Sequence, residues 1–345
     1  MNKTRTEILS TLNIATADFM EDTVSALNND NFLNSRFLRN SKPFQGEKIE
    51  VPLKYGRENT QTMDEFGEYE FQPKDILHPA YYEIRHIHGD MVLPQKQVDA
   101  QNVGKARLIN LARTRAENMT ESMDNQFSDL LFKSVADMDT TDPDSLIKIV
   151  ATINNTVGEI NSATETRFDW NPKVLNYTSE TPSYDNMTDP TSAYYVETLL
   201  RKIVGPLTVG KDKPTIGMCN QAFWDAYETI LRGAKRFNDA FMEVDGGFEV
   251  LKFRSMMIHV DQHVPGGKLN QVSDNAGMLL VLNEKYFHYR HAPAVNMEWT
   301  HWFKLEKQPA YASYLDWMGA FVCSRRDRQG AITGLVTDYQ AHGQW

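Results

Sequence analysis

The chain has 345 residues and a formal net charge of −10, from 36 basic and 46 acidic side chains. Hydrophobic residues make up 41% of it, enough for a substantial core, and this length is typical of about two domains. The acidic balance excludes a protein that wraps nucleic acid through a broad basic surface. A container remains compatible with it, because a shell need not neutralise the phosphates that it encloses.

Two features of the sequence bear on the compartment. Cys219 and Cys323 are too few for a zinc site or a disulfide framework, and their apolar flanks predict buried, reduced thiols. No apolar run approaches the roughly 20 residues that span a bilayer, and the first residues lack the apolar segment of a signal peptide. We therefore expect a soluble protein that is made in the cytoplasm and has no membrane segment.

The first 45 residues are polar and rich in asparagine, and their scattered apolar positions cannot form a core of their own. They are predicted to be an arm that lies on another surface, with one helical stretch near residues 18–27. A strand is predicted next at 48–54, where apolar and charged side chains alternate. A polar tip follows at 56–67, and a return strand is expected at 69–72.

Such a two-stranded ribbon is marginally stable in water by itself. We therefore expect it to need a partner surface, either within its own chain or on a neighbouring subunit.

The clearest helix is predicted at residues 99–136, where apolar side chains recur every three or four positions from Ile109 to Leu130. At 1.5 Å per residue it would be roughly 50 Å long. That length suggests a spine on which other elements lie, and its stripe of methionine and phenylalanine indicates core packing.

The rest of the chain mixes helices and strands, so the predicted class is α+β. Helices are predicted at 192–204 and 221–231, and a loop at 176–192. Strands are predicted at 215–218, 248–253, 256–260, 278–282, 297–305, 319–324 and 331–336.

A search for catalytic chemistry finds no phosphate-binding glycine loop and no nucleophile motif. His86 and His88 share one face of a strand and could bind a metal, but no third ligand lies in register. No catalytic residue, cofactor or metal site is predicted, and we expect the chain not to be an enzyme. A soluble metal-dependent hydrolase that uses His86 and His88 is the alternative from a different class.

The order of arm, ribbon, long helix, mixed region and returning strands resembles the tailed-bacteriophage major capsid proteins, whose fold is named after bacteriophage Hong Kong 97. The likeness is carried by the stretches 213–227, 247–253, 257–265, 278–283 and 321–335. Each motif is loose, and their order over nearly the whole chain is what makes the match specific.

The resemblance implies a division into an N-terminal arm (1–45), an extended loop (46–92), a peripheral domain (93–145 and 291–345) and an axial domain (146–290). It implies a major capsid protein that assembles with itself, as hexamers and pentamers, into an icosahedral shell around double-stranded DNA. Such a shell forms in the cytoplasm of the host bacterium and becomes part of the virion.

Further partners follow from the resemblance. They are a portal protein, a possible decoration protein and a separate scaffolding protein, because this chain has no room for a scaffolding domain before the arm. The tip contains no lysine, so no covalent cross-link from it is expected.

Contacts between subunits are predicted at the apolar stripe of the ribbon, at its acidic tip and at a basic cluster near the C-terminus. The candidate residues are Ile49, Val51, Leu53, Arg57, Glu58, Asp64, Glu65, Phe66, Glu68, Arg325, Arg326 and Arg328. The tip and the basic cluster could pair across subunits and fix their register, or both could be solvated turns.

Two alternatives share part of this interpretation. An encapsulin-like compartment would have the same fold but would hold a cargo enzyme, and the arm and ribbon favour the phage protein over it. A tail or decoration protein is disfavoured by the long helix.

Overall fold

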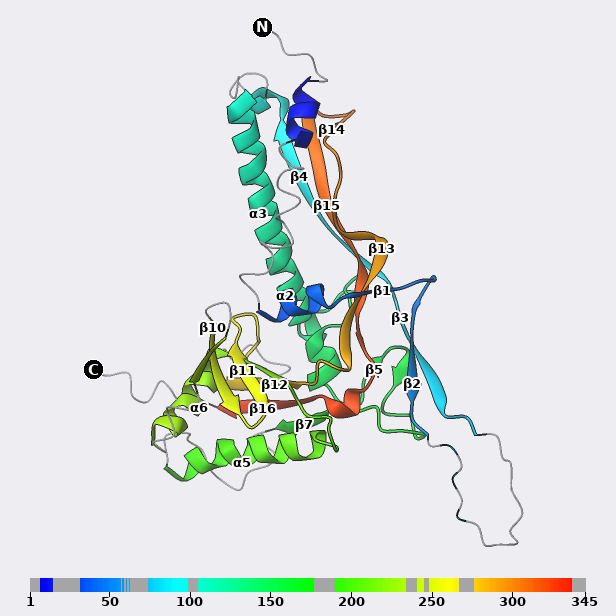
Figure 1. The fold of residues 1–345 in the computed structure, drawn as a ribbon, viewed down its shortest axis with the longest axis vertical. Coiled ribbons are helices and arrows are strands. Elements are labelled where there is room, and N and C mark those ends of the chain that lie inside the picture. Colours follow the sequence, from blue (N-terminus) through cyan, green and yellow to red (C-terminus); the bar gives the residue numbers. More distant parts are fainter. Residues whose placement is uncertain are drawn as a thin grey trace.

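A computed structural model describes residues 7–14, 32–56, 58, 60, 62, 74–98, 105–176, 190–233, 241–244, 248–266 and 276–336. Its helical elements are residues 7–14, α2 (Phe32–Arg39), a turn at 95–98, α3 (Lys105–Leu131), η2 (Val135–Asp137), η3 (Ile147–Ala151), α5 (Pro190–Leu207), α6 (Gln221–Gly233) and η4 (Arg326–Arg328). They lie in two parts, a long one built around α3 and a broader one that contains α5 and α6 (Figure 1).

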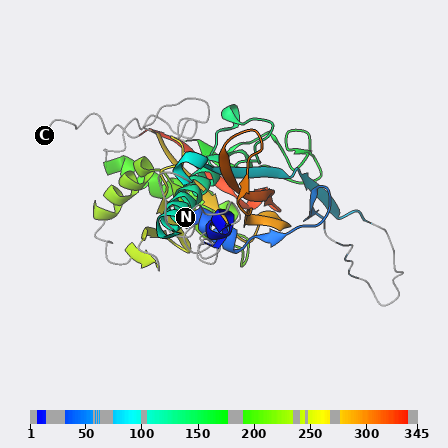
Figure 2. The same cartoon turned by 90° about the horizontal axis from the view of Figure 1, so that it is seen from above.

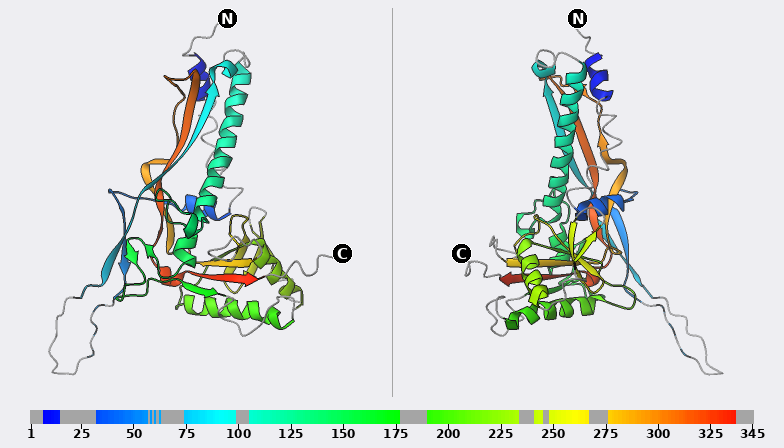
Figure 3. Two further views of the ribbon diagram at one scale, coloured as in Figure 1. Left: turned by 180° about the vertical axis from the view of Figure 1, so that it is seen from behind. Right: turned by 60° about the vertical axis from the view of Figure 1, so that its left-hand side comes forward.

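A five-stranded sheet runs along α3, and the two stay side by side in every view (Figure 3). Its strands are β1 (Lys42–Pro43), β4 (Arg85–Pro94), β13 (Phe287–Trp299), β14 (Phe303–Lys304) and β15 (Ala310–Cys323). The order is β1-β13-β15-β14, and β4 also pairs with β15. The helix buries its predicted apolar stripe against this sheet, with Ala112, Ala116 and Phe127 fully covered.

The spine helix ends earlier than predicted. Its described part begins at Lys105 and ends at Leu131, which corresponds to about 40 Å. The chain turns soon after Leu131 because the Asp142 carboxylate accepts hydrogen bonds from Lys133 Nζ at 2.7 Å and from the Asp139 amide at 2.8 Å. Residues 99–104 lie outside the described residues.

A seven-stranded sheet forms the core of the broader part. Its strands are β7 (Lys173–Asn176), β8 (Ile216–Cys219), β9 (Phe241–Val244), β10 (Phe248–Phe253), β11 (Met256–Val260), β12 (Ala276–Leu282) and β16 (Gly330–Val336). The order is β7-β16-β12-β8-β11-β10-β9. Buried residues of α5 and α6 share a hydrophobic cluster with this sheet, so the predicted mixture of helices and strands is confirmed.

Several predicted boundaries are wrong. The strand expected at 297–305 is interrupted, because β13 ends at Trp299 and β14 begins at Phe303. The last strand, β16, was predicted to lie in the peripheral domain with β15. It instead pairs with β12 and β7 and so belongs to the seven-stranded sheet. β4 was predicted to lie mostly in the extended loop, but it pairs with β15 over ten residues.

Both cysteines are fully buried, as predicted. None of the helices that the structure describes is long and apolar enough to cross a membrane.

The described parts of the arm pack on the body of their own chain. Leu12, Leu33 and Phe37 are buried in the same hydrophobic cluster as the spine. Asn34 Nδ2 donates to Asp124 Oδ1 of α3 at 2.5 Å, and the Tyr289 hydroxyl donates to Asn34 Oδ1 at 3.2 Å. These bonds join the arm to both α3 and β13. The helical stretch predicted at 18–27 lies outside the described residues.

The arm also touches the seven-stranded sheet through His259 of β11, whose ring stacks on Phe32 with centroids 3.8 Å apart. Burial, and then the nearby charge of Arg36, lowers the pKa of His259 from 6.5 to about 4. The folded chain therefore resists protonation in a pH range where the unfolded chain accepts a proton. The free energy of unfolding should fall as pH drops from about 6.5 towards about 4.

We expect His259→Phe, which keeps the aromatic stack, to remove about 2–3 kcal/mol of this acid-dependent loss. Urea unfolding of the purified chain at about pH 7 and about pH 4 measures it. His301→Phe at an exposed position should keep the wild-type loss. An equal loss in the His259 variant contradicts the prediction.

Candidate inter-subunit surfaces at the ribbon and its anchor

The ribbon consists of β2 (Ile49–Lys54), β3 (Leu77–Tyr82) and the connection between them. The two strands pair antiparallel from Ile49 with Tyr82 to Lys54 with Leu77. Seen from above, they leave the body on the side opposite to α6 (Figure 2). The return strand was predicted at 69–72, which lies outside the described residues, and the described return strand is β3.

The apolar stripe of the ribbon is covered by its own chain. Ile49, Val51 and Leu53 are 2%, 6% and 3% exposed and belong to the hydrophobic cluster of the body. The prediction that these three side chains lie on a neighbouring subunit is therefore wrong. Alternation along β2 shows that one face is buried, and the structure shows that the same subunit buries it.

A short hairpin supports the ribbon where it leaves the body. This bracket is formed by β5 (Thr156–Val157) and β6 (Ile160–Asn161). The Tyr81 amide of β3 donates to Gly158 O at 3.0 Å. Gly158 has φ +61°, and a Cβ there would lie 3.0 Å from that of Ala80, so glycine allows both the turn and the close approach.

Further contacts hold the edges of the ribbon. Lys48 Nζ lies 2.5 Å from a carboxylate oxygen of Glu159, and the rings of Tyr55 and Phe168 stack with centroids 5.2 Å apart. The ion pair is half exposed, so its contribution to stability is small. Together these contacts set where the ribbon begins.

Tyr82, the last residue of β3, is tied to the end of β15. Its hydroxyl donates to Cys323 O at 2.8 Å and accepts from the Cys323 amide at 3.2 Å. Burial raises the pKa of Tyr82 well above its ordinary value, so the hydroxyl keeps its proton.

The basic cluster at 325–328 does not present three free charges. Arg326 is fully buried. Arg325 contacts both carboxylate oxygens of Asp327, at 3.1 and 2.7 Å, and Arg328 Nε lies 3.2 Å from the same carboxylate. The prediction that this cluster pairs with a neighbour's acidic tip is therefore wrong for Arg326, because its guanidinium is enclosed. For Arg325 and Arg328 a carboxylate is already present within the chain.

The predicted tip residues are largely outside the described part of the chain. Glu58 is described and exposed. The others, Arg57, Asp64, Glu65, Phe66 and Glu68, lie outside the described residues.

The histidine pair of the hydrolase alternative lies on β4. His86 Nε2 is 3.3 Å from Asp316 Oδ1, and the rings of His86 and His88 have centroids 6.0 Å apart. Both side chains are exposed beside an open groove of about 410 Å³ between β4 and α3. Among the described residues no three metal-ligating side chains are grouped closely enough to hold an ion.

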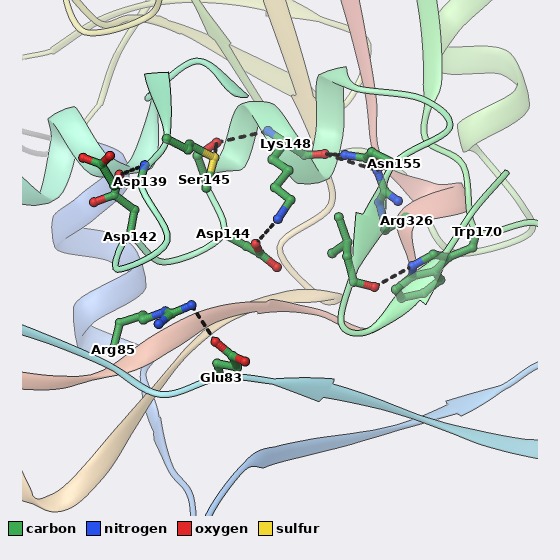
Figure 4. A network of polar contacts seen from close by, with 12 residues as sticks. Glu83, Arg85, Asp139, Asp142, Asp144, Ser145, Lys148, Asn155, Trp170 and Arg326 are labelled. Atoms are coloured by element: carbon green, nitrogen blue, oxygen red, sulfur yellow. Dashed lines mark hydrogen bonds and ion pairs between the residues drawn. The ribbon is translucent and has the colours of Figure 1, made fainter. Parts of the chain in front are cut away.

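Sequence reasoning missed the role of Arg326, which Figure 4 shows among backbone and side-chain acceptors of residues 148–155. Its Nε donates to Ile149 O at 2.8 Å, and Nη2 donates to Thr152 O and Asn155 Oδ1, both at 2.8 Å. Arg325 and Arg328 have the same side chain and lie in the same short connection, so no signal in the sequence singles out Arg326.

No family model matches the chain, and no curated protein resembles it in sequence. Solved structures do resemble it. The capsid asymmetric unit of cyanophage A-1(L) has a TM-score of 0.58 at 12% identity and covers 86% of this chain and 90% of its own. The chain has the Hong Kong 97 capsid fold.

Two further structures with this fold cover similar shares. A structure from Mycobacterium phage Ogopogo has a TM-score of 0.52 at 13% identity and covers 88% of this chain and 92% of its own. The capsid of a native GTA particle has a TM-score of 0.51 at 9% identity, with 87% and 90% covered. The Hong Kong 97 fold thus accounts for most of this chain.

Proposed function

We propose that this chain is a major capsid protein that assembles with itself, as hexamers and pentamers, into an icosahedral shell around double-stranded DNA. The observation that carries the proposal is the likeness of most of the chain to phage capsid structures. The ribbon supports it. β2 and β3 leave the body as a two-stranded element, and such an element is suited to reach other copies of the chain (Figure 3).

The acidic tip remains our candidate for contact with a neighbouring subunit. Asp64, Glu65 and Glu68 carry like charges in a short segment, and such a segment favours a basic surface on its partner. Arg325 and Arg328 are poor partners because both contact Asp327. Charge reversal at Asp64 and Glu65 tests the contact, and unchanged assembly and salt sensitivity contradict it.

The division into arm, extended loop, peripheral domain and axial domain is part of the proposal. The sheet pairing suggests that the peripheral domain holds α3 with β4, β13 and β15, and that the axial domain includes β16. A scaffolding protein, a portal protein and a decoration protein are the partners that such a shell would need or accept, and the virion would be its final location.

The decisive experiment is expression of the whole chain, with light scattering and electron microscopy of the purified product. We expect closed particles of megadalton mass, since one subunit has a mass of 39.5 kDa. A purely monomeric product, with or without a candidate scaffolding protein, contradicts the proposal. Particles purified from their natural source should contain double-stranded DNA, and particles that contain a cargo enzyme and no DNA indicate the encapsulin-like alternative.

A further inference from the structure

A buried arginine without an acidic partner lies at the point where the two sheets meet. Arg326 follows β15 of the five-stranded sheet and precedes β16 of the seven-stranded sheet. It makes no ion pair among the described residues, and its guanidinium donates to oxygens of residues 148–155. Burial lowers the pKa of Arg326 to about 10, so the side chain still carries its charge at neutral pH.

A buried charge is costly unless hydrogen bonds compensate it. The oxygens that accept from Arg326 therefore mark the segment, residues 148–155, that this side chain fixes in place. The carbonyls of Ile149 and Thr152 lie where the π-helical turn η3 ends and the chain becomes extended. Backbone carbonyls at such an end need partners from elsewhere. Arg326 supplies N–H donors to these carbonyls, which lie about 170 residues earlier in the chain.

The segment that Arg326 holds leads directly into the bracket. Asn155, whose Oδ1 accepts from Arg326, precedes β5. Trp170 Nε1 donates to Val157 O of β5 at 3.1 Å, and the Arg326 guanidinium lies 5.9 Å from the centre of the Trp170 ring. The bracket is therefore fixed both at its start and along one strand by groups that contact Arg326 (Figure 4).

The bracket in turn contacts the ribbon through Gly158 O and the Tyr81 amide. The ribbon has a second hold on the same connection, because the Tyr82 hydroxyl bonds to the backbone of Cys323, three residues before Arg326. The short connection between the two sheets is therefore linked to the base of the ribbon by two routes, and both routes end on β3.

We propose that Arg326 is a positioning residue for the ribbon. Through the turn at 148–155 and the bracket, it sets the direction in which β2 and β3 leave the body, and it couples that direction to the junction of the two sheets. This inference deepens the proposed function and rests on it, because ribbon direction decides which part of a neighbouring copy the ribbon can reach in a shell.

The test is Arg326→Lys in the whole chain. Lysine keeps the charge, but a single ammonium group cannot replace a planar fork that bonds to several separate oxygens. Hydrogen exchange at the Tyr81 amide should become about tenfold faster or more, while the Leu280 amide in the centre of the seven-stranded sheet should not change. The yield of regular particles should fall about tenfold or more.

Two further variants complete the design. Arg201→Lys changes an arginine of α5 that pairs with Glu197 on the surface, and it should alter neither exchange nor particle yield. Should Arg326→Lys not fold, Trp170→Phe removes the bond to Val157 O, keeps an aromatic ring, and should also speed exchange at Tyr81.

Unchanged exchange at Tyr81 in the variant that folds overturns the inference, and so does faster exchange with particles of normal yield and shape. Failure of the wild-type chain to form particles contradicts the proposed function instead.

Discussion

Replacing Trp317 with alanine is expected to reduce the free energy of unfolding by about 3–5 kcal/mol. Trp317 is fully buried in β15, between the five-stranded sheet and α3. Its ring meets Phe127 of α3 edge to face, with centroids 5.0 Å apart, and Phe321 at 6.1 Å. Removing it leaves a cavity that this cluster of large rings cannot fill by small shifts.

Equilibrium unfolding in urea measures the loss, and two variants isolate its cause. Trp317 Nε1 has no hydrogen-bond partner in the described part of the chain, so Trp317→Phe loses volume but no bond and should cost about 1–2 kcal/mol. Phe303→Ala, on the same sheet at a residue that is 39% exposed, should cost roughly 1 kcal/mol or less. Equal losses at Trp317 and Phe303 contradict this account of the core.

Gly319→Ala should destabilise the chain by a similar amount, because it adds an atom where there is no space for one. Gly319 lies in β15, paired with β13 on one side and β4 on the other. A Cβ there would lie 2.0 Å from the backbone carbonyl oxygen of Arg290 and 2.8 Å from the Trp317 ring. A backbone oxygen held in a sheet cannot move aside, so we expect a loss of about 3 kcal/mol or more, or insoluble protein.

Gly217→Ala is the matched control, since Gly217 also lies in an inner strand of a sheet. The nearest atoms to its Cβ would be the side-chain ends Ile258 Cγ1 and Leu279 Cδ1, both at 3.2 Å. Such atoms can shift by a few tenths of an ångström, so the cost should be about 1 kcal/mol. Thermal unfolding of both variants separates the cases, and a Gly319 variant as stable as the Gly217 variant refutes the steric argument.

Local elements were predictable where the side-chain pattern has a single cause. β10 and β11 match their predicted bounds at 248–253 and 256–260 because each ends at a turn and carries bulky apolar residues that favour strands. The stripe on α3 was also predicted, since a helix that covers a sheet must repeat its apolar residues with the helical period. The end of that helix was not, because side-chain contacts of Asp142 with Lys133 and Asp139 accompany the turn, and helical periodicity gives no sign of them.

The candidate site was less predictable than the fold. The alternation of Ile49, Val51 and Leu53 indicates a covered face, but a strand carries the same pattern whether its own chain or a neighbour covers it. The charges of residues 325–328 are typical of a solvated turn. Only the folded chain brings the carbonyls of 149 and 152 to Arg326 and leaves Asp327 between Arg325 and Arg328.

The amino-acid sequence by itself determined the α+β class, the position of most helices and strands, and their order along a capsid-like chain. These follow from side-chain periodicity and turn residues, which act over a few neighbouring positions. The tertiary structure decided which sheet β4 and β16 join, which chain covers the ribbon, and that Arg326 is an internal anchor. Those outcomes depend on contacts between segments about 180 to 230 residues apart, for which no local pattern in the sequence carries a signal.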